Sequence, residues 1–573
     1  MADFIVENVL IIDVITEQEY LGWFSVKDGR FIEVEAGHAP SRDELPAQER
    51  IDAQGLVARP GLIDAHMHIE SSLVTPARFA EAVLPWGTTT ILQDPHEVAN
   101  VLGAEGIRWM IHASQNLPLR IYAAISSCVP ATSSDIETPN ASIRPEDVLE
   151  LAKEEGVLAL GEMMDYQGLL DGNTHLQAML TAGRRAHLSL EGHIPSLTGR
   201  PLSRYIAHGI RSDHTLMTPA KLHEKLRKGL YVMLQEKSLT PDVIAAVTTL
   251  PDRSRILLIS DDVMPNRLRT GHMSRILETA VSLGWNPIDA LASATLRPAV
   301  YLGLRHLGAI APGYWADFML STKDQVFPPE QVYVNGKLVA EKGSPTITAS
   351  PELAAHDLSK TSFVAKTVPE DFFRLSHGSP SSKIRARVIK VNNENTFTTL
   401  EERSISLVDG VPTDEDLALG VVIARATLQK PVQASGKMVL VSGLGLRQGA
   451  YASTFAHDSH NVFVLGKSLA TMRHALEAVL SVDGGMAVVS DEESEPILLP
   501  LPVAGLLSNE PIAFVGERFD AMEEQLRQLG VGVKNPILLF TILPLTVSPE
   551  YKISDKGLVD VERRRIIEAV VSA

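Results

Sequence analysis

The sequence predicts an α/β protein: a (β/α)8 TIM barrel, a small β-sandwich domain formed by the flanking segments, and a C-terminal α+β domain. Between residues 60 and 304, near-continuous apolar runs alternate with amphipathic helical stretches, which is typical of a buried parallel sheet. Eight such runs in about 250 residues match the size of a (β/α)8 barrel. Strand-like segments with hairpin turns occur only on either side of this region, and mixed strands and helices follow it.

The eight apolar runs are the predicted strands of the barrel. A doubly wound sheet is the alternative, but it needs a glycine-rich first turn, and "DAHMHIE" is not one. The predicted strands are 61–68, 88–94, 120–126, 157–163, 186–193, 209–214, 230–236 and 255–262.

The flanking segments, residues 1–59 and 305–345, are each too small for an independent core. Asp28-Gly29 and Asn335-Gly336 separate short alternating strands, as expected of hairpin turns. We therefore expect the two segments to pair into one composite β domain interrupted by the barrel, 60–304. A linker begins near residue 344, and the C-terminal α+β domain spans 365–573.

Composition and charge exclude several classes of protein. The 573 residues are too many for one core, and 45% apolar with 21% charged residues is ordinary globular composition. A net charge of −18 argues against nucleic acid and against an anionic membrane surface as partners. One cysteine, Cys128, excludes a disulfide framework and a cysteine-based zinc ribbon. No signal peptide and no apolar run of about 18 residues is found, so a cytoplasmic location is expected.

Polar side chains that suit a metal stand at the ends of the predicted strands. His66 and His68 are two residues apart, so they share one face of the first strand and point into the barrel at its carboxyl end. That end is where barrel enzymes place their active sites. Two unrelated histidines at a loop edge are the alternative for this pair alone, but later strands end in further such residues: Glu162, His193, His214, Asp261 and Asp262.

This set predicts a metal centre with two ions. Imidazole and carboxylate ligands suit zinc, iron or manganese. Six ligands are too many for one open catalytic ion, and Glu162 is the group on the middle strand able to bridge two. The type of metal is not fixed by these ligands.

The strand-end pattern resembles the amidohydrolase superfamily, beginning with "GLIDAHMHIESS" and continuing with the acidic residue of strand four, the histidines of strands five and six and the aspartate of strand eight. Further segments are similar to the bacterial adenine deaminase family: "LQDPHEVANVLG", "LGEMMD", "LEGHIPSLTG", "GIRSDH", "GAIAPGYWAD" and "ASTFAHDSHNVFVLG" with "LPLPVAGLLS". The resemblance covers nearly the whole chain.

The resemblance implies hydrolytic deamination of adenine to hypoxanthine and ammonia by a metal-bridged hydroxide, as in purine salvage. It implies two ions per active site, Mn²⁺ or Fe²⁺ and alternatively Zn²⁺. One ion is expected on His66, His68, Glu162 and Asp261, and the other on Glu162, His193 and His214. Asp261 is expected to act as general base and then general acid. The partners expected are a purine base and further copies of the chain in a homo-oligomer.

Three other groups are weaker candidates. Asp94, His96 and Glu97 follow strand two and are candidates for binding the base edge, moving a proton or holding a further ion, with a helix-capping loop as the alternative. Asp262 and His272 are candidates for orienting the substrate. The role of "HDSHN" in the C-terminal domain is open between a metal or substrate contact and ordinary turn chemistry; its candidates are His457, Asp458 and His460.

Some positions depart from the family pattern and put the substrate in question. Thr215 stands where the family usually carries an acidic residue, Gln235 lies in "QEKS" instead of an arginine-bearing strand end, and 423–445 lacks the family's basic, histidine-containing segment. An N6-substituted adenine or another aminopurine is therefore an alternative substrate.

Single sequence features bear on each of the rival functions. Another amidohydrolase acting on a cyclic amide is the nearest rival, although dihydropyrimidinase-like enzymes typically carry a bridging lysine where this chain has Glu162. A cytidine-type zinc deaminase needs a P-C-x-x-C pattern, and a serine hydrolase needs G-x-S-x-G; neither is present. A non-catalytic scaffold on a decayed enzyme fold is disfavoured because all six expected ligands are present.

Overall fold

The computed structural model describes residues 1–346, 363–375, 381–393, 395, 397–429 and 434–572, so most of the predicted linker lies outside the described residues. The chain divides into two compact units, described separately below. The first comprises 1–95, 110–127 and 144–354, and the second 96–109, 128–143 and 355–573. Two segments from within the predicted barrel region therefore belong to the C-terminal unit. The domain boundaries read from the sequence remain predictions.

The N-terminal segment and the segment around 318–345 form one sheet in the order β18-β17-β16-β15-β5-β1-β2-β3, with β4 beside β1. Antiparallel pairing of β15 with β5 joins the two segments, as predicted, and Phe24, Phe318 and Tyr333 share the core of the sheet. Asp28-Gly29 and Asn335-Gly336 have positive φ angles, as tight hairpin turns require. The strands are β1 (Ala2–Asp13), β2 (Gln18–Lys27), β3 (Arg30–Ala36), β4 (Ala47–Asp52), β5 (Val57–Pro60), β15 (Phe318–Ser321), β16 (Gln331–Val334), β17 (Lys337–Glu341) and β18 (Ser344–Pro345).

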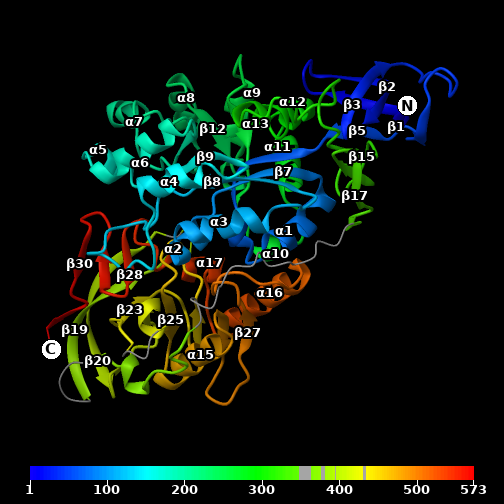
Figure 1. The fold of residues 1–573 in the computed structure, drawn as a ribbon. Coiled ribbons are helices and arrows are strands. Elements are labelled where there is room, and N and C mark those ends of the chain that lie inside the picture. Colours follow the sequence, from blue (N-terminus) through cyan, green and yellow to red (C-terminus); the bar gives the residue numbers. More distant parts are fainter. Residues whose placement is uncertain (347–362, 376–380, 394, 396, 430–433, 573) are drawn as a thin grey trace. The chain divides into compact units, whose positions relative to one another are not determined.

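All eight predicted parallel strands are confirmed, the eighth as two short strands, β13 and β14. Figure 1 labels β7, β8, β9 and β12 among them. They form a sheet in the order β10-β9-β8-β7-β6-β14 and a second in the order β11-β12-β13, with every pair parallel. Ala159 and Leu257 come from separate sheets but share one buried core with Ile63, so the parallel strands curl around a common interior. The strands are β6 (Leu62–His68), β7 (Thr88–Gln93), β8 (Arg120–Ile125), β9 (Val157–Met163), β10 (Ser189–Gly192), β11 (Ser212–Asp213), β12 (Tyr231–Leu234), β13 (Ile256–Leu258) and β14 (Asp261–Asp262).

Helices alternate with these strands along the chain, as the sequence predicts. Several begin at a proline with a threonine or asparagine before it, such as Thr218-Pro219 and Asn286-Pro287, where the missing N–H of proline has no consequence. Among the described residues, none of the helices is both long enough and apolar enough to cross a membrane. The helices of this unit are α1 (Pro76–Val83), α4 (Pro145–Leu151), α5 (Tyr166–Leu170), α6 (Thr174–Arg185), α7 (Gly199–Ile206), α8 (Pro219–Arg227), α9 (Pro241–Thr248), α10 (Pro265–Leu268), α11 (Met273–Ser282), α12 (Pro287–Ala292) and α13 (Leu296–Tyr301).

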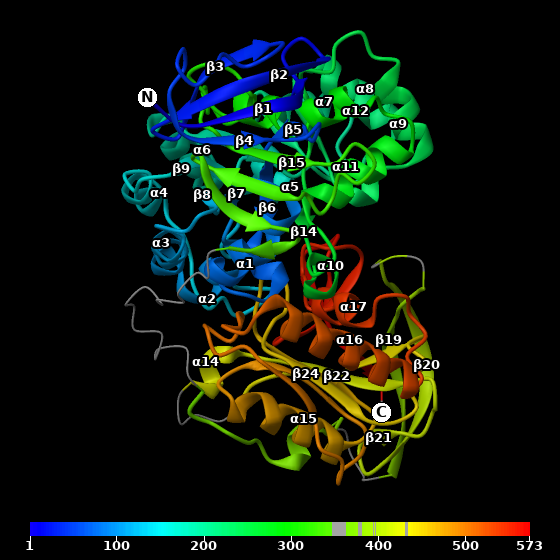
Figure 2. The same ribbon diagram turned by 90° about the vertical axis from the view of Figure 1, so that its right-hand side faces the viewer.

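The second unit is built on a mixed sheet in the order β21-β20-β19-β23-β22-β25-β24-β26-β27, with β31 beside β19. Helices α15 and α16 lie against it (Figure 2), and Ser468 caps α15 by accepting a hydrogen bond from the N–H of Thr471. The strands are β19 (Ser381–Lys390), β20 (Thr399–Val408), β21 (Val411–Pro412), β22 (Ala418–Ile423), β23 (Val439–Ser442), β24 (Ala450–Ser453), β25 (Val462–Gly466), β26 (Gly485–Val489), β27 (Ile497–Pro500) and β31 (Val570–Ser572), with a separate group β28 (Tyr551–Ser554), β29 (Gly557–Asp560) and β30 (Arg565–Ile567). The helices are α2 (His96–Leu102), α14 (Arg425–Leu428), α15 (Leu469–Ser481), α16 (Ile512–Gln528) and α17 (Pro536–Ile542), while α3 (Ala104–Ala113) crosses from this unit to the first.

Candidate metal centre

The six side chains predicted to bind metal converge in the first unit at the carboxyl ends of the parallel strands. This follows from strand geometry, because parallel strands bring their carboxyl ends to one edge of a sheet. All but one are buried by whole-residue exposure; the side chain of His193 is 29% exposed. The six are His66 and His68 in β6, Glu162 in β9, His193 and His214 just after β10 and β11, and Asp261 in β14.

Glu162 lies between the two groups of imidazoles. Its Oε1 is 3.4 Å from Nε2 of His68, whereas its Oε2 is 2.6 Å from Nδ1 of His193 and 3.1 Å from Nε2 of His214. Burial alone raises the pKa of this carboxyl, but the charges of His214 and His193 outweigh burial and hold the pKa well below its ordinary value. Glu162 is therefore an ionised carboxylate with one oxygen toward each group.

Asp261 is the second carboxylate close to the first pair of histidines. Its Oδ1 lies 3.5 Å from Nε2 of His68 and 3.9 Å from Nε2 of His66. Its backbone is left-handed, with a φ of 58°, a conformation that is uncommon for non-glycine residues and that occurs in turns and at functional sites. Burial raises the pKa of Asp261, but a hydrogen bond from His68 and the charges of His214, His68 and His66 lower it below the ordinary value.

The donor set fits divalent ions. Ligand atoms of His66, Glu162 and His214 lie within 4.8 Å of one another, and so do those of His66, His68 and Asp261. The Nε2 atom of His66 is buried without a hydrogen-bond partner in the described part of the chain, an arrangement that a bound cation explains. Without metal, protons hold the cluster together: burial disfavours the charged imidazole, yet Glu162 raises the pKa of His214 to about 9. Metal binding would release these protons.

Asp94 supports two of these ligands. Its Oδ2 accepts a hydrogen bond from the backbone N–H of Glu162 (3.1 Å), and its Oδ1 accepts one from the Ser126 hydroxyl (2.7 Å). Its backbone oxygen lies 2.8 Å from Nδ1 of His68, which fixes the proton there and turns Nε2 toward the cluster. Both carboxylate oxygens of this predicted substrate contact are thus engaged with the scaffold.

Asp262 and His272, the other candidates in this unit, also have scaffold partners. The Ser71 hydroxyl donates to Asp262. Nδ1 of His272 lies 3.0 Å from Oγ1 of Thr88, and its Nε2 lies 3.1 Å from the Ser260 hydroxyl. Burial lowers the pKa of His272 to about 3, so the imidazole is neutral. His272 therefore supports Ser260, the residue before Asp261.

Thr215 and Gln235, the two residues of the first unit that differ from the family pattern, contact the backbone beside the histidine ligands. The Thr215 hydroxyl donates to the backbone oxygen of Ile194 (3.0 Å), and Nε2 of Gln235 donates to the backbone oxygen of His214 (3.0 Å). A buried ion pair between Lys225 and Asp213, 2.5 Å apart, lies at the same strand ends. Thr215 and Gln235 therefore hold the ends of β10 and β11.

Glu191 is a residue that the sequence argument missed. Its Oε2 lies 3.1 Å from Nδ1 of His66, on the side of the ring that faces away from Asp261. Glu191 precedes His193 by two residues in the run "SLEGH", and this spacing places both on one face of the predicted strand. The alternation used for His66 and His68, applied to the strand end at His193, would have identified Glu191.

The second unit holds its own histidine–carboxylate cluster, around Glu97 of α2. Nδ1 of His457 is 2.5 Å from Oε1 of Glu97, and Nε2 of His460 is 2.5 Å from Oε2, which also accepts the backbone N–H of Asp458 (2.9 Å). Burial raises the pKa of Glu97, but His460 and His457 hold it well below its ordinary value. Nε2 of His96 lies 3.3 Å from Oδ1 of Asp458. The structure thus brings "HEVAN" and "HDSHN" together, and their roles remain predictions.

Arg425 fixes the backbone of the "HDSHN" turn. Its buried guanidinium donates to the backbone oxygens of His460 (2.8 Å), Thr454 (3.0 Å) and Ala504 (3.0 Å). Asp458 and His460 have left-handed φ angles of 62° and 46°. Arg425 lies in segment 423–445, which differs from the family pattern. Residues 430–433 of this segment fall outside the described residues.

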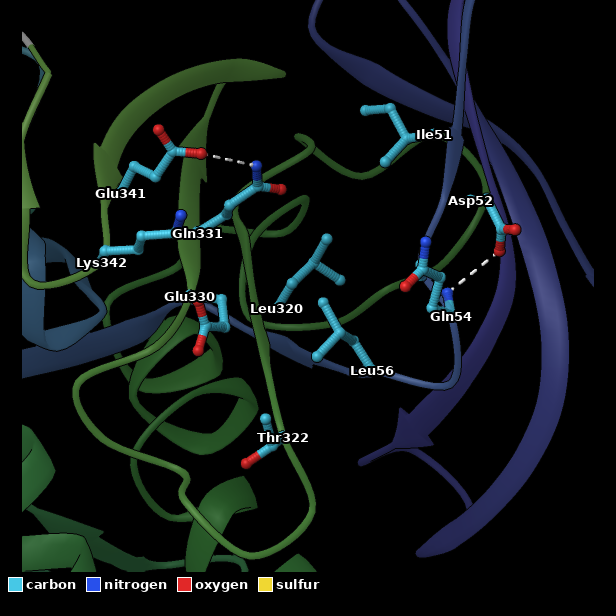
Figure 3. Close-up of a pocket in the computed structure, with 11 residues that line it drawn as sticks. Ile51, Asp52, Gln54, Leu56, Leu320, Thr322, Glu330, Gln331, Glu341 and Lys342 are labelled. Atoms are coloured by element: carbon cyan, nitrogen blue, oxygen red, sulfur yellow. Dashed lines mark hydrogen bonds between the residues drawn. The ribbon is translucent and has the colours of Figure 1, made fainter.

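A separate hollow of about 380 Å³ lies at the small β sheet (Figure 3). Its lining includes Leu56, Leu320 and Glu330, and Gln331 donates to Glu341 across it (3.2 Å). None of the predicted metal ligands lines this hollow. It is therefore distinct from the histidine cluster.

Comparisons with known proteins agree with this geometry. Residues 57–339 match the amidohydrolase family, and residues 395–565 match the adenine deaminase C-terminal domain. Adenine deaminase 2 of Carboxydothermus hydrogenoformans is 37% identical over 576 residues, which cover 99% of this chain and 96% of the relative. Adenine deaminase of Archaeoglobus fulgidus is 36% identical over 569 residues, covering 99% of this chain and 95% of the relative.

Proposed function

Because the chain belongs to the adenine deaminase family of amidohydrolases, we propose that it hydrolyses adenine to hypoxanthine and ammonia. The observation that carries the proposal is the convergence of four imidazoles and two carboxylates at the ends of parallel strands, in a chain similar to adenine deaminases over nearly its whole length. We infer that the curled parallel sheet is a (β/α)8 barrel. A role in purine salvage, a cytoplasmic location and a homo-oligomeric state belong to the same proposal.

The residues that would hold two divalent ions are His66, His68, Glu162 and Asp261 for one, and Glu162, His193 and His214 for the other. Their nitrogen and oxygen donors suit Mn²⁺, Fe²⁺ or Zn²⁺. When bound, such ions lower the pKa of a water from about 15.7 to near 7, so that hydroxide is available at neutral pH.

Asp261 is the residue placed to move protons. Its pKa is lowered, so at neutral pH it is ionised and able to accept a proton from the attacking water. Its side chain is 12% exposed, whereas that of Glu162 is 3% exposed, so Asp261 is the carboxylate more accessible to a substrate. The water oxygen bonds to the ring carbon that bears the amine. Asp261 then returns the proton to the ring nitrogen or the leaving amine, the remaining hydroxyl proton goes to the other of the two as the carbonyl forms, the C–N bond breaks, and ammonia departs.

The scaffold contacts of Thr215 and Gln235 remove an objection to adenine as the substrate. Both side chains donate hydrogen bonds to backbone oxygens beside or at the histidines His193 and His214. Packing at the strand ends therefore explains why these two residues differ from the family pattern. An N6-substituted adenine remains the second candidate, because nothing in these contacts selects against a substituent on the amine.

The experiment is release of ammonia or methylamine by purified protein loaded with Mn²⁺, with adenine, 6-methylaminopurine and guanine compared. We expect turnover on adenine to exceed turnover on the other two. Faster release of methylamine from 6-methylaminopurine would show that the substrate is an N6-substituted adenine, and the proposed metal centre would stand. Binding of two ions with no turnover on any of the three would contradict deamination of these bases.

A further inference from the structure

The far side of the His66 ring is held by two buried residues from distant parts of the chain. Nδ1 of His66 lies 3.1 Å from Oε2 of Glu191 in β10. The hydroxyl of Tyr301, at the end of α13, donates to Oε1 of the same carboxylate at 2.9 Å. All three residues are at most 5% exposed. Both oxygens of Glu191 are therefore engaged, one by an imidazole and one by a phenol.

This arrangement fixes the tautomer of His66. A carboxylate accepts hydrogen bonds and does not donate them, so Nδ1 of His66 carries the proton and Nε2 presents its lone pair. Nε2 is the atom that has no hydrogen-bond partner in the described part of the chain, and it lies 3.9 Å from Asp261. Burial and the charge of Glu191 raise the pKa of Tyr301 well above its ordinary value, so the phenol stays protonated and continues to donate.

His68 offers a contrast within the same strand. Its Nδ1 lies 2.8 Å from a neutral acceptor, the backbone oxygen of Asp94. At Nδ1, His66 thus faces a carboxylate, whereas His68 faces a neutral carbonyl oxygen. A carboxylate behind an imidazole makes the imidazole a stronger donor to a cation and limits rotation of the ring.

We propose that Glu191 and Tyr301 are a positioning pair for His66, and that they set the affinity of the centre for the ion that His66 binds. Glu191 orients the ring and strengthens its donor atom, and Tyr301 holds the carboxylate in place. This inference rests on the proposed metal centre, but it assigns to Glu191 and Tyr301 a role that is separate from contact with the substrate.

The test measures metal binding, not only activity. Full-length metal-free wild type, Glu191→Ala, Glu191→Gln and Tyr301→Phe are titrated with Co²⁺, followed by its visible absorption, and with Mn²⁺, followed by equilibrium dialysis. We expect Glu191→Ala to lower the affinity for one of the two ions by about 10- to 100-fold, as is typical when the hydrogen-bond partner of a metal-binding histidine is lost. Glu191→Gln, whose amide oxygen still accepts a hydrogen bond from Nδ1 of His66, should keep most of the wild-type affinity. Tyr301→Phe should show a smaller loss of affinity for the same ion.

The matched control is Asp317→Asn. Asp317 is also a buried carboxylate, and it pairs with Arg120 at the amino end of β8, away from the strand ends that carry the histidines. This variant should lose stability but bind both ions with wild-type affinity. Should Glu191→Ala misfold, the Glu191→Gln and Tyr301→Phe titrations still decide the matter.

The outcomes separate this inference from the proposed function. Wild type that binds fewer than two ions would overturn the proposed centre itself. Wild type that binds two ions, together with Glu191 and Tyr301 variants of unchanged affinity, would overturn only the positioning pair. A selective loss of affinity for one ion, with the affinity for the other ion unchanged and kcat restored at high metal concentration, would support it.

Discussion

Two clusters of histidines and carboxylates, one in each unit, have similar compositions but differ in the groups that lie behind their imidazole rings. Around Glu97, both carboxylate oxygens accept bonds from His457, His460 and the backbone of Asp458. Around Glu162, the imidazoles of His66 and His68 donate from Nδ1 to acceptors outside the cluster, Glu191 and the backbone oxygen of Asp94, and turn Nε2 inward. The Glu97 carboxylate is thus hydrogen-bonded within its own cluster, whereas Nε2 of His66 has no hydrogen-bond partner in the described part of the chain.

The difference shows that residue type alone does not identify a metal centre. Imidazole can donate or accept, and the partner on its far nitrogen decides which atom faces the cluster. Nδ1 of His460 accepts a backbone N–H from Ala456, so its Nε2 carries a proton toward Glu97. Nδ1 of His66 faces a carboxylate, so its Nε2 carries none. The partner behind each ring therefore decides which imidazole nitrogen can present a lone pair to a cation.

The largest expected effect comes from Glu162→Gln. The amide has lost the charge that holds two cations together, so we expect metal content to fall below two ions per chain. Activity on adenine should drop by about 10³-fold or more, because the charge stabilisation supplied by a catalytic metal is worth several kcal/mol. Metal analysis and steady-state kinetics on adenine measure both. Retention of two ions with wild-type kcat would contradict the bridging role of Glu162.

Asp261→Asn separates proton transfer from metal binding. The asparagine oxygen can still face the histidines, but the side chain no longer accepts a proton at neutral pH. We expect kcat to fall by about 10²- to 10⁴-fold, the usual contribution of a general acid–base group, with most of the metal retained. The comparison of kcat with metal content checks this. Near-native turnover at full metal content would exclude Asp261 as the proton carrier.

The positions of the metal-ligand candidates could be predicted because they depend on strand alternation and on parallel strands ending at one edge. His66 and His68 at i and i+2, and Glu162, His214 and Asp261 at later strand ends, follow from local pattern alone. The eight strands were predictable for the same reason, since each is a short apolar run between helical segments.

The partners of these residues could not be predicted in this way. Tyr301 reaches Glu191 from 110 residues away, and Asp94 reaches the N–H of Glu162 from 68 residues away. Such contacts depend on how helices and loops return to the sheet, which periodicity does not encode. Membership of residues 96–109 and 128–143 in the second unit is another long-range property of this kind.

Glu97→Gln is the matched change in the second cluster. Glutamine offers one acceptor where the carboxylate offered two, so it places an N–H₂ group opposite one of the imidazole N–H groups of His457 and His460. Breaking a buried charged network in this way costs about 3–5 kcal/mol of stability. We expect a lower unfolding midpoint in urea but two bound ions per chain, in contrast to Glu162→Gln. Loss of an ion from this variant would show that the two clusters are not separate in function.

The smallest expected effect concerns Glu137, a buried carboxyl of the second unit that accepts a hydrogen bond from Thr132 at 2.8 Å. Burial, with the charges of Asp458 and Asp555, raises the pKa of Glu137 to about 7 from 4.5. The folded state therefore keeps a proton that the unfolded state loses between pH 4.5 and 7, so this group makes the protein less stable as the pH rises through that window. Glu137→Gln removes the titration and should stabilise the protein by about 2–3 kcal/mol more at pH 8 than at pH 5. Urea unfolding of the full chain at the two pH values measures this, with the exposed Glu495→Gln as control. An equal effect at both pH values would show that Glu137 is ionised in the folded protein throughout.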